Sequence, residues 1–218
     1  MLRCKKGFTM VELAFVTVIF PIFFLSLYSV FDAANVIYRT NGVFSQLNQN
    51  AMQTLRYISR EVGQTSPNAT PSHLSITQGA NNNSVVTFQI PVDCDNDGDV
   101  EAGEGASCTQ NLNNNKYVEW GAYDEAGQTQ NGRLGSWVRY SVVNGQLTRQ
   151  VLDSGLGPIA GLQKVVANQV QSFAVTQNVK TLTMTMTLSG TDRVGQAGQP
   201  RTVQTTFASS TLLRNAVS

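Results

Sequence analysis

The sequence predicts an α+β protein in which a long N-terminal helix packs on an antiparallel β-sheet domain. Three observations lead to this prediction. Apolar residues form an almost unbroken block near the N-terminus, their spacing is helical up to about residue 62, and a period of two follows. At 218 residues the chain is long enough for one good-sized domain and an elongated segment.

The apolar block is the first element. Every residue over 8–31 is apolar or small and uncharged, with the exception of Glu12. That length matches a membrane-spanning helix, which needs about 20 residues. Arg3, Lys5 and Lys6 precede the block, so the positive-inside rule puts the N-terminus in the cytoplasm. An ordinary secretory signal has a shorter apolar core and a small-residue cleavage site behind it, and this block has neither.

Glu12 is the one charged residue inside the block. A carboxylate in hydrocarbon is costly unless it is neutralised or paired, so its presence indicates a function. The alternative is a side chain that stays protonated or reaches back to the membrane surface.

The stretch Lys5-Lys6-Gly7-Phe8-Thr9-Met10-Val11-Glu12-Leu13 resembles the cleavage and methylation motif of type IV pilins and type II secretion pseudopilins. In that family a prepilin peptidase cuts after the glycine and methylates the new N-terminus. The resemblance implies a leader of residues 1–7, a cut between Gly7 and Phe8, and pairing of the Phe8 amine with Glu12 of a neighbouring subunit. The alternative is a plain membrane anchor.

The resemblance also implies a location and partners. The chain would cross the inner membrane once, with its N-terminus cytoplasmic and its head domain periplasmic, and would then enter a filament at the cell surface. Its partners would be the prepilin peptidase and other pilin or pseudopilin subunits.

The helix-bending proline departs from the family pattern. Pilins commonly carry it near the mature twenty-second residue, which is Ser29 here, whereas this chain has Pro21. Any bend is therefore expected nearer the N-terminus. The segment from Val11 to Phe15, together with Pro21, is also similar to pseudopilins of tight-adherence systems, which leaves the type of machine open.

Residues 32–62 are expected to continue the helix in amphipathic form, so that it runs from Phe8 to about Val62. Gly42 is a point where it could bend, and the polar stretch 63–71 ends it. One apolar stripe, with steps of three and four residues, is expected to pack on the following domain. The stripe consists of Phe44, Leu47, Ala51, Leu55, Ile58 and Val62.

Residues 63–218 are expected to form a β-rich head domain outside the membrane. Alternating segments predict strands at 85–90, 117–120, 182–188 and 202–209. The strongest hairpin signal is the Asn144-Gly145 turn between strands 138–143 and 147–152. This hairpin looks like that of W-type minor pilins and J-type pseudopilins, and the ending from Leu212 to Asn215 is similar too.

An acidic segment from residue 93 to 104 follows the pattern D-x-D-x-D-G-x5-E of calcium loops. Calcium takes six to eight oxygen ligands, and carboxylates at alternate positions can converge on one ion where the chain turns at a glycine. We therefore expect an isolated calcium loop, and the alternative is a solvated acidic turn without metal. The expected ligands are the side chains of Asp93, Asp95 and Asp97, the carbonyl of Asp99, Glu101 directly or through water, and Glu104 as a bidentate closer.

The three cysteines fall into two groups. Cys4 lies in the predicted leader and would be removed with it, whereas Cys94 and Cys108 flank the acidic segment. A disulfide between them would close a loop of about 15 residues and contribute about 3 kcal/mol. It would also indicate an oxidising compartment. The alternative is two free thiols.

The composition and the motifs of the chain argue against two classes of function, nucleic-acid binding and catalysis. The chain is 13% charged with a formal net charge of +1, and this gives no basic footprint for nucleic acid. We find no catalytic triad, phosphate-binding loop or zinc spacing in the sequence, so an enzyme is not expected. The leading hypothesis is a minor subunit of a type IV pilus or type II secretion filament that acts in a tip or initiation complex. The alternatives are a calcium-dependent adhesion module on a pilus and a membrane-anchored calcium-binding protein outside any filament.

Overall fold

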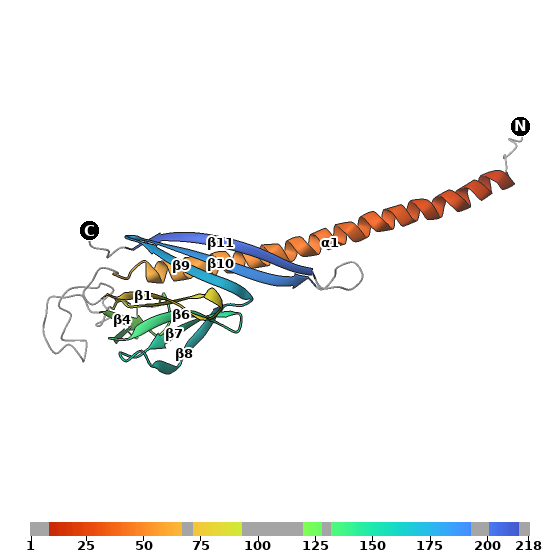
Figure 1. Ribbon diagram of the computed structural model, residues 1–218. Coiled ribbons are helices and arrows are strands. Elements are labelled where there is room, and N and C mark those ends of the chain that lie inside the picture. The colour runs from red at the N-terminus through yellow and green to blue at the C-terminus, as the bar shows by residue number, and fades with distance from the viewer. Residues whose placement is uncertain (1–8, 67–71, 93–119, 128–131, 193–200, 214–218) are drawn as a thin grey trace, which may run out of the picture. The chain divides into compact units, whose positions relative to one another are not determined.

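The computed structural model describes residues 9–66, 72–92, 120–127, 132–192 and 201–213 (Figure 1). One long N-terminal helix is followed by antiparallel sheets, so the α+β prediction is confirmed. By internal contacts the chain divides into two compact units. Residues 1–43 and 191–201 make the first unit, and residues 44–190 and 202–218 make the second.

The elements of the described residues follow one another in a simple order. They are α1 (Met10–Val62), β1 (Leu74–Gln78), the short 3-10 helix η1 (Ala80–Asn82), β2 (Ser84–Phe88), β3 (Ile90–Pro91), β4 (Trp120–Tyr123), β5 (Gly132–Leu134), β6 (Trp137–Val143), β7 (Gln146–Leu152), β8 (Pro158–Ala167), β9 (Val170–Asn178), β10 (Thr181–Asp192) and β11 (Arg201–Leu212).

The outer half of α1 packs through the predicted stripe. Leu47, Ala51, Leu55, Ile58 and Val62 are buried, as expected for a helix with one apolar face. The exception is Phe44, at the beginning of the second unit, which remains 43% exposed. Two polar residues on the same face, Thr54 and Glu61, are also buried. The helix is continuous across Pro21 and Gly42, so neither residue ends it.

The largest sheet has five antiparallel strands in the order β1-β2-β6-β7-β8. Its centre is the predicted hairpin, in which Val143 pairs with Gln146. The two turn residues between them, Asn144 and Gly145, have φ values of 51° and 73°. Positive φ at both central residues is the requirement of a type I′ turn, which matches the twist of the flanking strands. The hairpin prediction is confirmed.

The remaining strands of the described residues form two three-stranded sheets, β11-β10-β9 and β3-β4-β5. In β10 the alternation is regular, since Leu182, Met184, Met186 and Leu188 are all buried. The β9 strand is joined to the five-stranded sheet through side chains. Asn83 Oδ1 accepts a hydrogen bond from the Phe173 amide at 2.7 Å, and Ser84 Oγ accepts one from the Val175 amide at 2.9 Å.

Candidate functional site

The first part of α1 exposes an apolar surface. All side chains from Met10 to Phe31 are exposed, and the values include 88% for Met10, 69% for Leu25 and 70% for Tyr28. By length and composition this part of the helix could cross a membrane. A helix that is apolar on all sides is stable only where lipid or other protein covers it.

Glu12 is held by the residue that caps the helix. Its Oε2 accepts hydrogen bonds from the Thr9 amide at 2.9 Å and the Thr9 hydroxyl at 3.0 Å. The Glu12 amide in turn donates to Thr9 Oγ1 at 3.3 Å. This reciprocal arrangement is a capping box, and it satisfies two of the backbone donors that a helix N-terminus leaves free. Within a single chain, the carboxylate therefore already has partners.

The other predicted site residues lie outside the described residues. This applies to the processing residues Gly7 and Phe8, and to the predicted disulfide between Cys94 and Cys108. It also applies to the predicted calcium ligands Asp93, Asp95, Asp97, Asp99, Glu101 and Glu104. Over the part of the chain that the structure describes, no group of three His, Cys, Asp or Glu side chains is arranged to hold a metal ion.

The residues on either side of the acidic segment are held together. Strand β3 before it pairs with β4 after it, with Ile90 opposite Gly121 and Pro91 opposite Trp120. The Trp120 ring also stacks on the imidazole of His73, with centroids 4.2 Å apart and an interplanar angle of 9°. The segment from 93 to 119 therefore leaves and re-enters the fold at neighbouring points.

Hydrogen bonds fix the orientation of His73. Its Nδ1 lies 2.7 Å from Gln89 Oε1, and Gln89 Nε2 donates to the Ser136 carbonyl at 3.1 Å. Because the Gln89 oxygen faces the ring, Nδ1 carries the proton and donates. His73 thus serves to anchor the Trp120 side of the acidic segment.

A buried ionic cluster, which the sequence did not predict, joins the end of α1 to the sheet. Arg149 on β7 is 2% exposed, and its Nη2 lies 2.6 Å from Glu61 Oε1. The Tyr140 hydroxyl donates to Glu61 Oε2 at 2.5 Å. Arg149 also donates to the carbonyls of Tyr123 at 2.8 Å and Asp124 at 3.0 Å. The only available signal was a glutamate at stripe spacing, three residues after Ile58.

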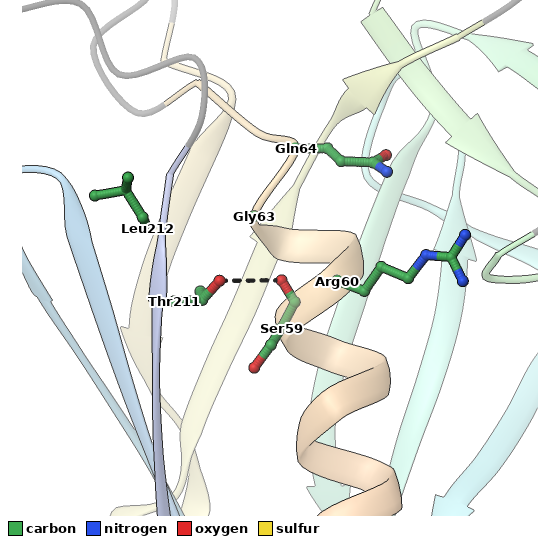
Figure 2. Close-up of a pocket in the computed structure, with 6 residues that line it drawn as sticks. All are labelled: Ser59, Arg60, Gly63, Gln64, Thr211 and Leu212. Atoms are coloured by element: carbon green, nitrogen blue, oxygen red, sulfur yellow. Dashed lines mark hydrogen bonds between the residues drawn. The ribbon is translucent and has the colours of Figure 1, made fainter.

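A pocket of about 480 Å³ lies where α1 ends, between the helix and the end of β11 (Figure 2). Its wall is close-packed, because the Thr211 hydroxyl donates to the Ser59 carbonyl at 3.3 Å. A Cβ added to Gly63 would lie 2.8 Å from that same carbonyl, so glycine allows this approach. The lining residues are Ser59, Arg60, Gly63, Gln64, Thr211 and Leu212. They offer no carboxylate, thiol or imidazole for acid–base or nucleophilic chemistry.

Comparison of the chain with protein-family models, curated proteins and solved structures finds no significant match.

Proposed function

We propose that the chain is a membrane-anchored subunit of the type IV pilin kind, matured by a prepilin peptidase and assembled as a minor pilin or pseudopilin. The observation that carries this proposal is the exposed apolar surface of α1 from Met10 to Phe31 with one carboxylate, Glu12, near its start. The Lys6-Gly7-Phe8 sequence before it supplies the predicted processing site.

The exposed apolar surface of α1 would have to be covered both in the membrane and in a filament. Covering one large apolar side chain is worth about 1.5–3 kcal/mol, so a helix segment of this composition strongly favours lipid over water. A helical filament core offers equivalent cover, since neighbouring helices replace the lipid. The subunit could therefore pass from membrane to filament without exposing this surface to water.

Glu12 would select the axial register in which subunits pass from the membrane into the filament. The capping box gives its carboxylate two hydrogen bonds from Thr9 within one chain, which lowers the cost of keeping it in the membrane. Cleavage after Gly7 would create an α-amine on Phe8. An amine from a neighbour is a stronger partner than a neutral hydroxyl, because both groups are charged. The correct axial register of two subunits is then the one that brings amine and carboxylate together.

The test is substitution of Glu12 in cells that contain the prepilin peptidase and the filament system. Glu12→Val should be cleaved normally and remain in the membrane, yet be lost from sheared filaments. Thr17→Val is the matched control, because Thr17 is exposed on the same helix and its hydroxyl donates to the Ala14 carbonyl, within one turn. Equal recovery of Glu12→Val and the wild-type chain in filaments would refute the proposed role.

We further propose that residues 93–104 bind calcium and that Cys94 and Cys108 form a disulfide around them. The pairing of β3 with β4 supports this proposal, because it closes the ends of the longer segment 93–119 that contains these residues. A loop whose ends are held loses less conformational entropy when it wraps an ion. This site would order the head domain or present it to a partner, either for adhesion or for assembly.

A further inference from the structure

The outer side of the β9-β10-β11 sheet carries a regular array of uncharged side chains, which we call the threonine face. The register of β9 on β10 places Thr176 opposite Thr183 and Ser172 opposite Thr187. Hydrogen bonds from Thr183 to Ser210 at 3.1 Å and from Thr187 to Thr206 at 3.0 Å extend the array to β11. The face consists of Ser172, Ala174, Thr176, Asn178, Thr181, Thr183, Thr185, Thr187, Thr206, Ala208, Ser210 and Leu212.

The threonine face has no charged residue at any of its positions. Exposed faces of soluble domains usually mix Lys, Arg, Glu and Asp among their polar residues. Strand propensity explains the threonines, but it does not explain the absence of charge. The five-stranded sheet differs in this respect, with Lys164 exposed on β8 and Arg139 half-buried on β6.

This face points away from the rest of the second unit. The opposite side of the sheet is core, where Phe173, Val175 and Met184 are at most 4% exposed. The contacts of β11 with α1 use Ser209 and Thr211, which alternate with the residues of the threonine face. On β11 the residues of the threonine face are all exposed, including Leu212 at 65%.

We propose that the threonine face binds the same face of a second copy of this chain. A neutral face is complementary to itself, because stacking it on its copy desolvates no charge and brings no like charges together. Threonine methyl groups provide apolar contact, and the hydroxyl groups can donate and accept across the interface. A charged face would repel its copy, so the absence of charge is what allows this pairing.

The symmetry of such a pair sets the relative direction of the two α1 helices. Figure 1 shows β11 and the outer half of α1 running in the same direction, and the Ser59–Ser209 contact places them side by side. Face-to-face stacking around a two-fold axis along the strands therefore keeps the outer halves of both α1 helices parallel. Edge-to-edge pairing of β11 with an antiparallel copy would reverse one of them.

The size of the face sets the strength of the contact. Three strands about 4.8 Å apart and eight residues rising about 3.3 Å each cover about 380 Å². A stable interface buries about 800 Å² on each partner. The pair is therefore expected to be weak in dilute solution and to form where a membrane holds both copies at high effective concentration.

The test is disulfide cross-linking of the full chain in membranes after Thr183→Cys. Thr183 lies on the central strand β10 of the face, so a two-fold axis along that strand brings it opposite Thr183 of the second copy, and the chain with its own cysteines gives the baseline. Gln163→Cys, exposed on β8 of the other sheet, is the matched control. We expect a cross-linked dimer with Thr183→Cys alone. Failure to exceed the baseline, or equal cross-linking of Gln163→Cys, would overturn the proposal.

Charge substitutions then separate face pairing from misfolding. Thr185→Lys or Thr185→Glu in every copy should each reduce the Thr183→Cys dimer about tenfold, because like charges on the central strand β10 meet across the axis. Co-expression of the two variants should restore the dimer, which a folding defect could not do. An unchanged dimer in the lysine variant would overturn the proposal. The proposed dimer does not depend on the proposed filament role of Glu12. The Glu12→Val chain should therefore still form the dimer.

Discussion

The Glu61 carboxylate at the end of α1 and the Arg149 guanidinium on β7 form a buried bidentate ion pair, with both side chains at most 4% exposed. Nε and Nη2 of Arg149 both donate to Glu61, and the remaining contacts of the guanidinium go to backbone carbonyls. Burial of two charges is tolerated only with this degree of satisfaction. The pair therefore specifies one position of the helix end on the sheet, at which Nε, Nη1 and Nη2 of Arg149 all have acceptors.

Removal of one partner should be strongly destabilising. In Arg149→Met the Glu61 carboxylate stays buried without its cation, and we expect a loss of about 3–5 kcal/mol of unfolding free energy. Denaturant titration of the full chain in detergent, followed by circular dichroism, measures this loss.

The double variant Glu61→Leu with Arg149→Met is the matched control. It removes both charges together, so it should recover most of the lost stability. A double variant as unstable as Arg149→Met would show that the cost comes from altered packing and not from the unpaired carboxylate.

The Tyr140 hydroxyl should make stability depend on pH in the alkaline range. Burial, and secondarily the Glu61 carboxylate, raise the pKa of Tyr140 well above its ordinary value of 10. Between these two values the unfolded chain loses the tyrosine proton while the folded chain keeps it. The unfolded state then binds fewer protons, so the stability that is fully present below pH 10 falls as pH rises above it.

Tyr140→Phe tests that dependence. It should cost about 1.5 kcal/mol at neutral pH, because a hydrogen bond to a charged group is lost. Above pH 10 the stability difference between the two proteins should narrow. Parallel stability curves across that range would contradict the assignment to Tyr140.

Thr9 should stabilise the first turn of α1 through its capping box with Glu12. Thr9→Ala removes the hydroxyl and should cost about 1 kcal/mol, or roughly fivefold faster amide exchange in that turn. Thr9→Ser keeps the hydroxyl and should exchange at the wild-type rate. Hydrogen exchange of the full chain in lipid, resolved at residues 9–13, makes the comparison, and equal rates in both variants would contradict the capping role.

Calcium should stabilise the head domain if residues 93–104 bind it. Millimolar calcium should raise the thermal unfolding midpoint of the full chain, and chelation should reverse the increase. Asp97→Asn and Glu104→Gln should each abolish the response, whereas Asp153→Asn, on an exposed turn elsewhere, should retain it. An equal shift in all three variants would mean that calcium acts at another site.

The parts of the fold that could be predicted are those with strong local patterns. The stripe of α1 has a helical period, the turn Asn144-Gly145 admits only a few backbone conformations, and Leu182 to Leu188 alternates because one side is core. Strand β8 was missed because it has no such pattern. It is exposed over most of its length, and Gly161 at φ +80° interrupts it.

The buried ion pair could not be predicted because its two partners lie 88 residues apart. A glutamate and an arginine at that separation are ordinary in any sequence, and only the packing of α1 on β7 brings them together. Glu12 is the opposite case, since a charge among apolar neighbours is visible in the sequence itself. Its capping contact with Thr9 is local and follows the T-x-x-E spacing of a capping box.

The proposed pilin-type maturation is tested most directly by the intact mass of the chain purified from cells with an active prepilin peptidase, with and without reductant. We expect a mature chain that begins at N-methylated Phe8, and that gains the mass of two hydrogens on reduction if Cys94 and Cys108 are paired. An uncut chain that begins at Met1 would contradict the filament role and leave a membrane-anchored protein.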